Sequence, residues 1–393
     1  MPNTHALKAD PEKLAPRSIE TAIRDDLSTK AVFVGGPRQV GKTMMAQRLL
    51  HIFANAQAKP GVYLNWDHRA HREDIIANRM PTEAALLVLD EIHKYAHWRD
   101  MVKGLYDTHF GQLPLLITGS ARLDYYRKGG DSMLGRYHYH RLHPFSLNEL
   151  DVKHRHDVKT LLRFGGFPEP FLAQNARHHR RWQRARRERI LYDDLRDLER
   201  VREISLLELL LEHLPACVGS PLSVRSLARK LQVAPKSVES WLGIFERLYL
   251  VYRISPYGSP RIRAVKKEQK LYFWDWSELT QSGACFENLV ASQLLKYCHQ
   301  QEDQEGWTME LRYVRDTDGR ELDFVVLQEG KPLFAVECKQ GEREASKHAA
   351  YFRERTPIPR FYQVHLGEKD YGHAARDIRV LPFTRFCTEL GMP

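Results

Sequence analysis

The chain has 393 residues, which is enough for two or three domains with ordinary cores. Sixty Lys and Arg against 50 Asp and Glu give a formal net charge of +10, which favours a polyanionic partner without identifying it. No apolar run approaches the roughly 20 residues that a membrane helix needs, and the N-terminal segment lacks the apolar stretch of a signal peptide. Five scattered Cys without a C-x-x-C pair argue against a zinc site. We therefore expect a cytoplasmic protein without a membrane partner.

The first third of the chain alternates short apolar runs with helical patterns. The candidate buried strands are residues 31–35, 62–67, 85–91 and 113–120. Buried strands that alternate with helices predict a parallel α/β sheet. The first strand is followed directly by a glycine-containing loop and then by a helical pattern.

That loop, GPRQVGKT at residues 36–43, fits the phosphate-binding pattern G-x-x-x-x-G-K-[ST] at every fixed position. Its glycines let backbone N–H groups curl around phosphates, its lysine would neutralise the β- and γ-phosphates, and its threonine would ligate Mg²⁺. We therefore predict ATP and Mg²⁺ as ligands. The residues expected to contact them are Gly36, Gln39, Gly41, Lys42 and Thr43.

Polar residues at the ends of later strands suggest the rest of an ATPase site. Asp90, at the end of LLVLDE, is predicted to complete the Mg²⁺ shell, and Glu91 to polarise the attacking water. The alternative is that these two acids are a solvated strand end. Ser120, after LLITG, would sense the γ-phosphate or orient the water. Arg136 is predicted as an arginine finger that reaches a neighbouring subunit's phosphate, with a structural ion pair as the alternative.

The middle of the chain changes to a basic, helical texture. Residues 151–204 are predicted as a connector, and its segment 177–189 holds seven Arg that form either a solvated helix face or a surface for phosphates. Residues 205–258 show three helical patterns and then the strand-like VYRIS, the layout of a winged helix-turn-helix. Such a domain binds DNA or serves as a lid between subunits.

The last predicted domain spans residues 259–393. It has a helical pattern at 285–298, followed by candidate strands at 310–316, 321–328 and 332–339. A polar helix at 342–355 and a further strand at 359–367 complete the pattern.

Seven segments, in this order, resemble a large prokaryotic family of AAA-type ATPases that end in a restriction-endonuclease-like domain. They are GPRQVGKT, LLVLDEIHKYAHW, ITGSARL, LGRYHYHRLHPFS, GGFPE (165–169), LYFWDW and the pair ELDFVV and FAVECK. The resemblance implies an α/β architecture with an AAA-type P-loop core at 1–150, the winged helix-turn-helix at 205–258, and a PD-(D/E)xK-like domain at 259–393. Some members resemble Holliday-junction branch-migration motors, whose subunits form rings around DNA.

In the PD-(D/E)xK arrangement, facing carboxylates hold a metal ion and a nearby lysine stabilises developing charge. The matching residues here are Asp323, Glu337 and Lys339, with Glu287 on the preceding helix as a further acid. Because side chains alternate along a strand, Asp323 and Glu337 share a face only if paired residue numbers add to 660. We predict that this register requires a three-residue turn at 329–331, whereas a two-residue turn would direct Glu337 away. The alternative to a cutting site is a fold-stabilising cluster or a metal-free DNA cradle.

These patterns together predict an ATP-hydrolysing AAA-type motor that acts on DNA, in particular on branched or structured duplex. We expect it to form a homo-oligomer, a hexameric ring. Two alternatives remain open: a nucleotide switch or scaffold that controls a protein partner, and an ATP-regulated, Mg²⁺-dependent nuclease.

Overall fold

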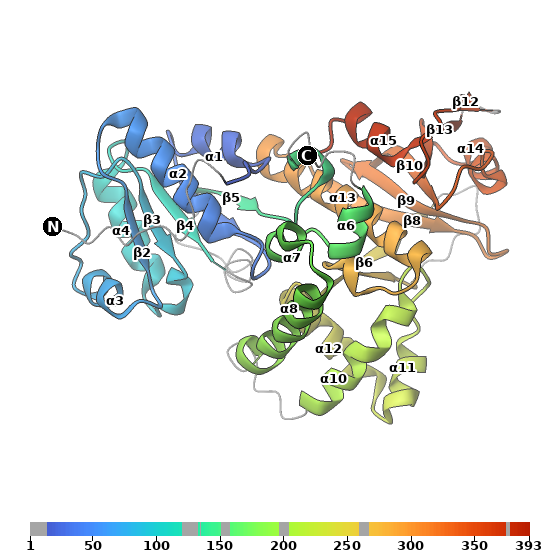
Figure 1. Cartoon of the computed structure of the whole chain (residues 1–393), viewed down its shortest axis with the longest axis horizontal. Helices are drawn as coiled ribbons and strands as arrows, with labels where there is room; N and C mark the ends of the chain where they lie inside the picture. The colour runs from blue at the N-terminus through green and yellow to red at the C-terminus, as the bar shows by residue number, and fades with distance from the viewer. Residues whose placement is uncertain are drawn as a thin grey trace. The chain divides into compact units, whose positions relative to one another are not determined.

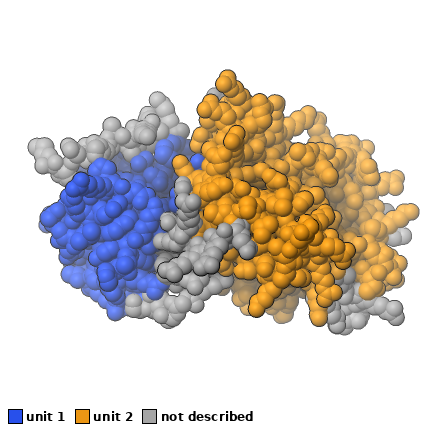
Figure 2. Space-filling view, turned by 90° about the horizontal axis from the view of Figure 1, so that it is seen from below, with its two compact units in different colours: residues 1–143 blue, residues 144–393 orange. Residues whose placement is uncertain are grey.

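The computed structural model describes residues 14–119, 133, 135–150, 158–195, 204–258, 267–374 and 378–393. The chain divides into two compact units, Met1–His143 and Pro144–Pro393, which Figure 2 colours separately. Among the described residues, no helix is long and apolar enough to cross a membrane.

A five-stranded parallel sheet forms the centre of the first unit, in the order β2-β3-β4-β1-β5 (Figure 1). Its strands are β1 (Ala31–Gly35), β2 (Val62–Asn65), β3 (Leu87–Asp90), β4 (Leu115–Thr118) and β5 (Tyr137–Arg141). Its helices are α1 (Glu20–Asp26), α2 (Lys42–Gln57), α3 (Arg69–Ile76) and α4 (Trp98–His109). The four predicted strands and the parallel α/β sheet are confirmed, and β5 is an additional strand.

The core of this unit explains why the apolar runs form strands. All residues of β1, β3 and β4 are buried, as expected for central strands of a parallel sheet with helices on both faces. On one face, Phe33 packs against Trp98 of α4, with ring centroids 5.8 Å apart. Phe33 also stacks on Tyr137 at 4.4 Å, so the polar-looking strand β5 is held by its aromatic residues.

The second unit begins with helices. They are α6 (Val158–Phe164), α7 (Pro168–Ala173), α8 (Ala176–Arg189), α10 (Ile204–His213), α11 (Val224–Leu231) and α12 (Pro235–Arg247), with a π-helical turn at Ile190–Asp194. The glycines of GGFPE allow close packing inside this unit: a Cβ added to Gly166 would lie 2.6 Å from the Trp276 ring and 2.8 Å from the carbonyl oxygen of Phe145. This motif therefore has a packing role.

An eight-stranded sheet, in the order β12-β13-β11-β10-β9-β8-β6-β7, completes the second unit. Its strands are β6 (Val251–Pro256), β7 (Lys270–Phe273), β8 (Met309–Arg315), β9 (Glu321–Gln328), β10 (Lys331–Lys339), β11 (Phe361–His365), β12 (Gly372–Ala374) and β13 (Ile378–Pro382). Its helices are α13 (Ser282–Glu305), α14 (Lys347–Arg355) and α15 (Phe383–Glu389). The antiparallel pair β6–β7 follows α11 and α12, in the order expected of a wing, and β6 also pairs with β8. The winged-helix and nuclease-like assignments stay predictions.

The hairpin β9–β10 corrects the predicted turn. Its loop is the two-residue Glu329–Gly330, with φ of 51° and 72°, and Lys331 pairs with Gln328. A β-bulge between Pro332 and Phe334 then shifts the register, so that paired residue numbers add to 659 before it and to 660 after it. The three-residue turn was therefore wrong, but the register that places Asp323 and Glu337 on one face is reached by the bulge.

Candidate functional site

The phosphate loop connects the carboxyl end of β1 to the start of α2. Gly36 and Gly41 have φ of 140° and 101°, values that favour glycine, and a Cβ on Gly36 would lie 2.4 Å from the carbonyl oxygen of Leu142. The Lys42 ammonium donates hydrogen bonds to the carbonyl oxygens of Gly36 and Pro37, at 2.9 and 2.7 Å. The loop thus presents a helix N-terminus and a lysine at one place, which is an arrangement suited to phosphates.

A buried arginine that the sequence patterns did not reveal supports this loop. The Arg17 guanidinium donates to the carbonyl oxygens of Val40 and His143, at 2.9 and 2.5 Å. Glu20 accepts from the backbone N–H of Arg17 at 2.8 Å and pairs with Arg48 of α2 at 3.0 Å. Because charge-assisted hydrogen bonds are stronger than neutral ones, this contact fixes the end of the phosphate loop.

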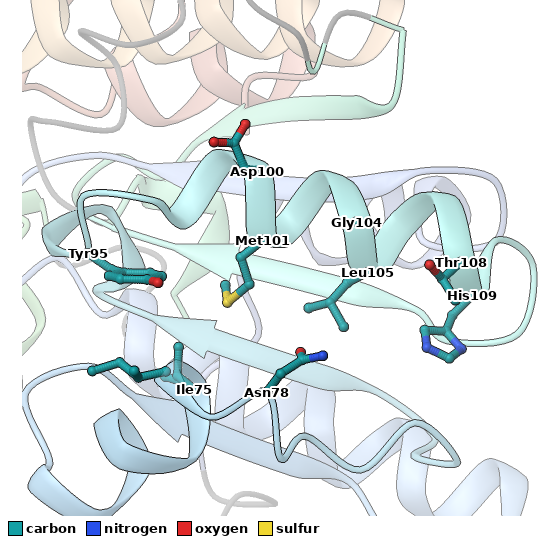
Figure 3. Close-up of a pocket in the computed structure, with 10 residues that line it drawn as sticks. Ile75, Asn78, Tyr95, Asp100, Met101, Gly104, Leu105, Thr108 and His109 are labelled. Atoms are coloured by element: carbon teal, nitrogen blue, oxygen red, sulfur yellow. The ribbon is translucent and has the colours of Figure 1, made fainter.

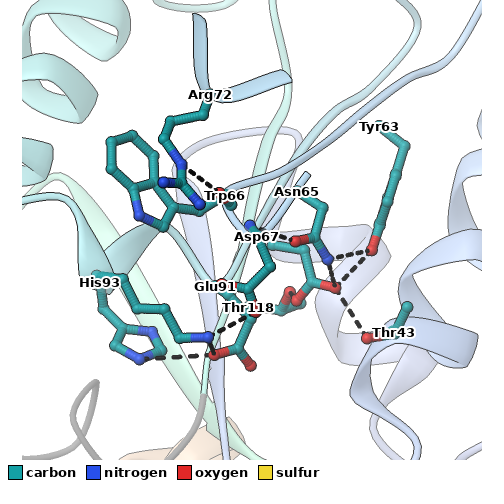
Figure 4. Close-up of polar contacts among 11 residues, drawn as sticks. Thr43, Tyr63, Asn65, Trp66, Asp67, Arg72, Glu91, His93 and Thr118 are labelled. Carbon is teal, nitrogen blue, oxygen red and sulfur yellow. Dashed lines mark hydrogen bonds and ion pairs between the residues drawn. The ribbon is translucent and has the colours of Figure 1, made fainter. Parts of the chain in front are cut away.

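A polar network at the same edge of the sheet includes Thr43, Tyr63, Asn65 and Thr118 (Figure 4), and these four residues all bond to Asp90. Its side chain is buried and accepts hydrogen bonds from Thr43 at 2.8 Å, Tyr63 at 2.5 Å and Asn65 at 3.3 Å, and also from Thr118. The predicted neighbours Thr43 and Asp90 are therefore brought together. Tyr63 and Asn65, on β2, were missed because a single polar residue in a short strand carries no motif.

Tyr63 keeps its proton in this network. Burial, followed by the charge and hydrogen bond of Asp90, raises the pKa of the Tyr63 hydroxyl well above its ordinary value. The hydroxyl therefore acts as a hydrogen-bond donor to Asp90 across the physiological pH range.

Glu91, the residue after Asp90, adopts a left-handed backbone with φ of 55°, which is unusual for a residue with a side chain. Its Oε2 lies 3.5 Å from the Lys94 ammonium and 3.6 Å from His93 Nε2. Lys94 also pairs with Asp67 at 2.6 Å. The side chains of Lys94 and His93 thus lie beside the Glu91 carboxylate, and its Oε2 makes no hydrogen bond with the described residues.

The two remaining predicted residues of the ATPase site have different outcomes. Ser120 lies outside the described residues. Arg136 precedes β5 at the amino edge of the sheet, roughly 16 Å from the carboxyl edge if each residue of a strand advances about 3.3 Å. There it forms an ion pair with Asp107 at 2.7 Å. Arg136 therefore cannot contact the phosphate loop of its own chain.

A separate cavity of about 340 Å³ lies in the first unit between α3 and α4 (Figure 3). Met101 and Leu105 of α4 point toward Ile75 and Asn78, and Tyr95 closes one end. The cavity contains none of the predicted site residues, so it is not the nucleotide site.

The predicted nuclease residues of the second unit do come together. Glu337 and Lys339 of β10 pair at 2.6 Å, and Asp323 of β9 accepts from the backbone N–H of Cys338 at 2.7 Å. Glu287 of α13 accepts from the Tyr272 hydroxyl at 2.8 Å. Sequence reasoning missed two members of this cluster, the buried Lys270 of β7 and Glu321 of β9.

Electrostatics shape the protonation of this acidic cluster. Burial, assisted by the charge of Asp323, raises the pKa of Glu287 to about 7 and that of Glu337 to about 8. Burial alone would lower the pKa of Lys270, but the charges of Glu287, Asp323 and Glu321 raise it above its ordinary value. Lys270 is therefore a permanent cation within the cluster.

The raised pKa of Glu337 predicts a stability that falls as the pH rises. Between the ordinary glutamate pKa, about 4.5, and the value of about 8 in the folded chain, the folded state holds a proton that the unfolded state has lost. We expect the free energy of unfolding of the second unit to fall by about 1 to 3 kcal/mol from pH 6 to pH 9. Urea denaturation followed by tryptophan fluorescence would measure it. Glu337→Gln should flatten this dependence and Glu344→Gln, at an exposed position, should not; equal slopes in all three proteins would contradict the assignment.

Three family models match the chain in succession. Residues 28–151 match a model described as an AAA domain, whereas residues 155–281 and 282–386 match two models described as domains of unknown function. The AAA match covers the sheet, the phosphate loop and Asp90. The nuclease-like assignment of the C-terminal region gains no support from these matches and stays a prediction.

Two uncharacterized proteins of Methanocaldococcus jannaschii are relatives of the chain. One is 24% identical over 382 residues, which cover 80% of this chain and 76% of the relative. The other is 22% identical over 277 residues, which cover 64% of this chain and 60% of the relative.

Solved structures similar to this chain include two DNA complexes. The Orc1 protein of Aeropyrum pernix in complex with DNA has 16% identity and a TM-score of 0.33, covering 71% of this chain and 94% of that chain. The replication initiator DnaA bound to AMPPCP and single-stranded DNA has 14% identity and a TM-score of 0.36, covering 62% of this chain and 93% of that chain. TM-scores this low do not establish a shared arrangement of the whole chain. The AAA match over residues 28–151 and the geometry of the phosphate loop together support a P-loop ATPase core in the first unit.

Proposed function

We propose that this chain hydrolyses ATP and couples the hydrolysis to work on DNA. The observation that carries the proposal is the contact between Thr43, at the start of α2, and the buried Asp90, with 2.8 Å between their oxygens. These are the two side chains that P-loop ATPases use to hold the Mg²⁺ of bound Mg·ATP.

Each residue of the site would have a defined task in hydrolysis. The backbone N–H groups of residues 36–43 and the Lys42 ammonium would bind the phosphates. Thr43 and Asp90 would hold Mg²⁺, which neutralises negative charge on the phosphates when bound. Glu91, which directly follows Asp90 in the chain and has the Lys94 ammonium 3.5 Å from its carboxylate, would orient the attacking water and accept its proton.

The proposal of a DNA partner is supported by the arginines of α8. Arg177, Arg180, Arg181 and Arg184 are exposed, and their spacing of three, four and seven residues places them along one face of the helix. Arg186, by contrast, is buried over the Phe167 ring at 4.3 Å, and Arg187 pairs with Glu278 at 2.6 Å. In the basic segment 177–189, Arg186 and Arg187 therefore have structural contacts, whereas the four exposed arginines form a stripe that fits a phosphate backbone.

An assembly of several copies follows from the position of Arg136, if this residue acts in hydrolysis. Because Arg136 lies at the sheet edge opposite to its own phosphate loop, it would act only on the ATP of a neighbouring copy. We propose a homo-oligomeric ring on this ground.

Glu91→Gln is expected to lower ATP turnover by about 100-fold or more while nucleotide binding remains, because the amide cannot accept the proton of the attacking water. Lys42→Ala should lose both binding and turnover. Phosphate release and the binding of a fluorescent nucleotide would measure the two effects. Glu83→Gln, at an exposed position before β3, is the matched control and should behave as wild type. Full turnover in Glu91→Gln would refute this assignment.

Arg136→Ala and Lys42→Ala should each be inactive alone, yet an equimolar mixture should recover a measurable part of the ATP turnover. The Lys42→Ala copy would donate Arg136 to the intact phosphate loop of the other copy. Asp107→Asn removes only the ion partner of Arg136 and should stay active. If Asp107→Asn loses activity as Arg136→Ala does, and mixing restores nothing, the arginine is structural.

Replacing Arg177, Arg180 and Arg181 by Gln should weaken DNA binding and reduce the slope of log K against log salt by about 2 to 3, because each phosphate contact contributes about 0.9. The matched control replaces the exposed Lys59, Arg69 and Arg79 of the first unit by Gln, which changes the net charge equally. Binding and ATP turnover would be measured with linear, forked and four-way DNA. A wild-type protein that neither binds DNA at low salt nor responds to it would favour a protein partner instead.

A further inference from the structure

We propose that the acidic cluster of the second unit, formed by Glu287, Glu321, Asp323 and Glu337, is closed by the ammonium of Lys270 and excludes a divalent cation. The residues that match a metal-dependent nuclease motif would then stabilise the fold and would not cleave DNA. This inference concerns the second unit alone and does not depend on the ATPase activity proposed above.

Lys270 lies among three of these carboxylates, those of Glu287, Glu321 and Asp323. Its side chain is fully buried, it bonds to Glu321, and its nitrogen is 3.3 Å from Glu287 and 3.9 Å from Asp323. The Tyr313 ring lies beside it, with 5.4 Å between the ammonium and the ring centroid. A buried ammonium requires carboxylate partners, so this lysine and these acids stabilise one another.

The second oxygens of Asp323 and Glu321 have donors of their own. Tyr272 donates to Oε1 of Glu287 at 2.8 Å, the same oxygen that Lys270 contacts, and the backbone N–H of Cys338 donates to Oδ2 of Asp323 at 2.7 Å. Arg315 pairs with the second oxygen of Glu321 at 2.8 Å. Together with the Lys339–Glu337 pair, three cationic side chains therefore face four acidic ones.

A divalent cation does not fit this arrangement. Mg²⁺ requires near-octahedral oxygen ligands at about 2.0 to 2.1 Å and keeps several waters, whereas the Lys270 ammonium already lies within ion-pair distance of Glu287, Glu321 and Asp323. Two like charges so close together in a buried site repel each other strongly. Consistent with this, the described residues contain no group of three His, Cys, Asp or Glu side chains arranged to hold a metal ion. Glu337 Oε2 is buried without a hydrogen-bond partner among them, but one such oxygen is not a metal site.

The test is a Mn²⁺ titration of the nucleotide-free, full-length protein, followed by electron paramagnetic resonance of free Mn²⁺ and by thermal unfolding. At Mn²⁺ concentrations up to ~1 mM, where the weakest protein carboxylate sites are occupied, wild type should show no saturable binding that Asp323→Asn removes. Lys270→Met leaves the carboxylates without their cation, so it should bind Mn²⁺ at least about tenfold more tightly than wild type. Mn²⁺ should also raise its Tm, because a ligand that binds only the folded state stabilises that state.

Lys331→Met is the matched control, since Lys331 is an exposed lysine of the same sheet. It should titrate as wild type does. Wild-type Mn²⁺ binding that disappears in Asp323→Asn would overturn the proposal, and this comparison decides the matter even if Lys270→Met fails to fold. A folded Lys270→Met that binds no more Mn²⁺ than wild type would contradict the role given to the lysine.

Discussion

A buried carboxylate must be satisfied by donors, and the kind of donor decides what it can then do. Asp90 shows one solution: Thr43, Tyr63, Asn65 and Thr118 are neutral groups that orient the carboxylate without neutralising it. The acidic cluster of the second unit shows the other, because Lys270, Arg315 and Lys339 neutralise its members directly. The first arrangement leaves negative charge available for a cation that arrives with a nucleotide. The second arrangement leaves little negative charge available for a cation.

The nucleotide-binding edge of the first sheet was predictable because each of its motifs is a short, contiguous stretch of sequence. The glycines of the phosphate loop, the lysine and the acid at the end of β3 each follow an apolar strand, and parallel strands bring their carboxyl ends to one edge. Strand β5 was not predicted, because it alternates Tyr with His and lacks an apolar run. The Arg17 contact was not predictable either, since one arginine before α1 carries no signal for the carbonyls that it will meet.

The second unit shows that the number of residues in a hairpin turn does not by itself determine the register of the two strands. A two-residue turn with both φ values positive is the favoured connection of a hairpin, but without a bulge it would place Asp323 and Glu337 on opposite faces. The bulge after Pro332 supplies the missing residue within the strand and not in the loop. Lys270 was missed for a related reason. It reaches the cluster from β7, which is distant from the hairpin in sequence, and a buried lysine in a strand has no motif.

The bulge and the lysine also show how an acidic motif of this kind can stabilise the fold. The bulge directs Glu337 inward beside Asp323, and this costs free energy unless cations compensate the acids. Lys270 and Lys339 compensate part of that cost, and loss of a single acid would in turn leave a buried lysine with fewer partners. Such mutual dependence couples these acids and lysines through the stability of the fold. A fold-stabilising cluster therefore requires Asp323, Glu337 and Lys339 in one register just as a nuclease does. The position of Lys270 favours the fold-stabilising cluster.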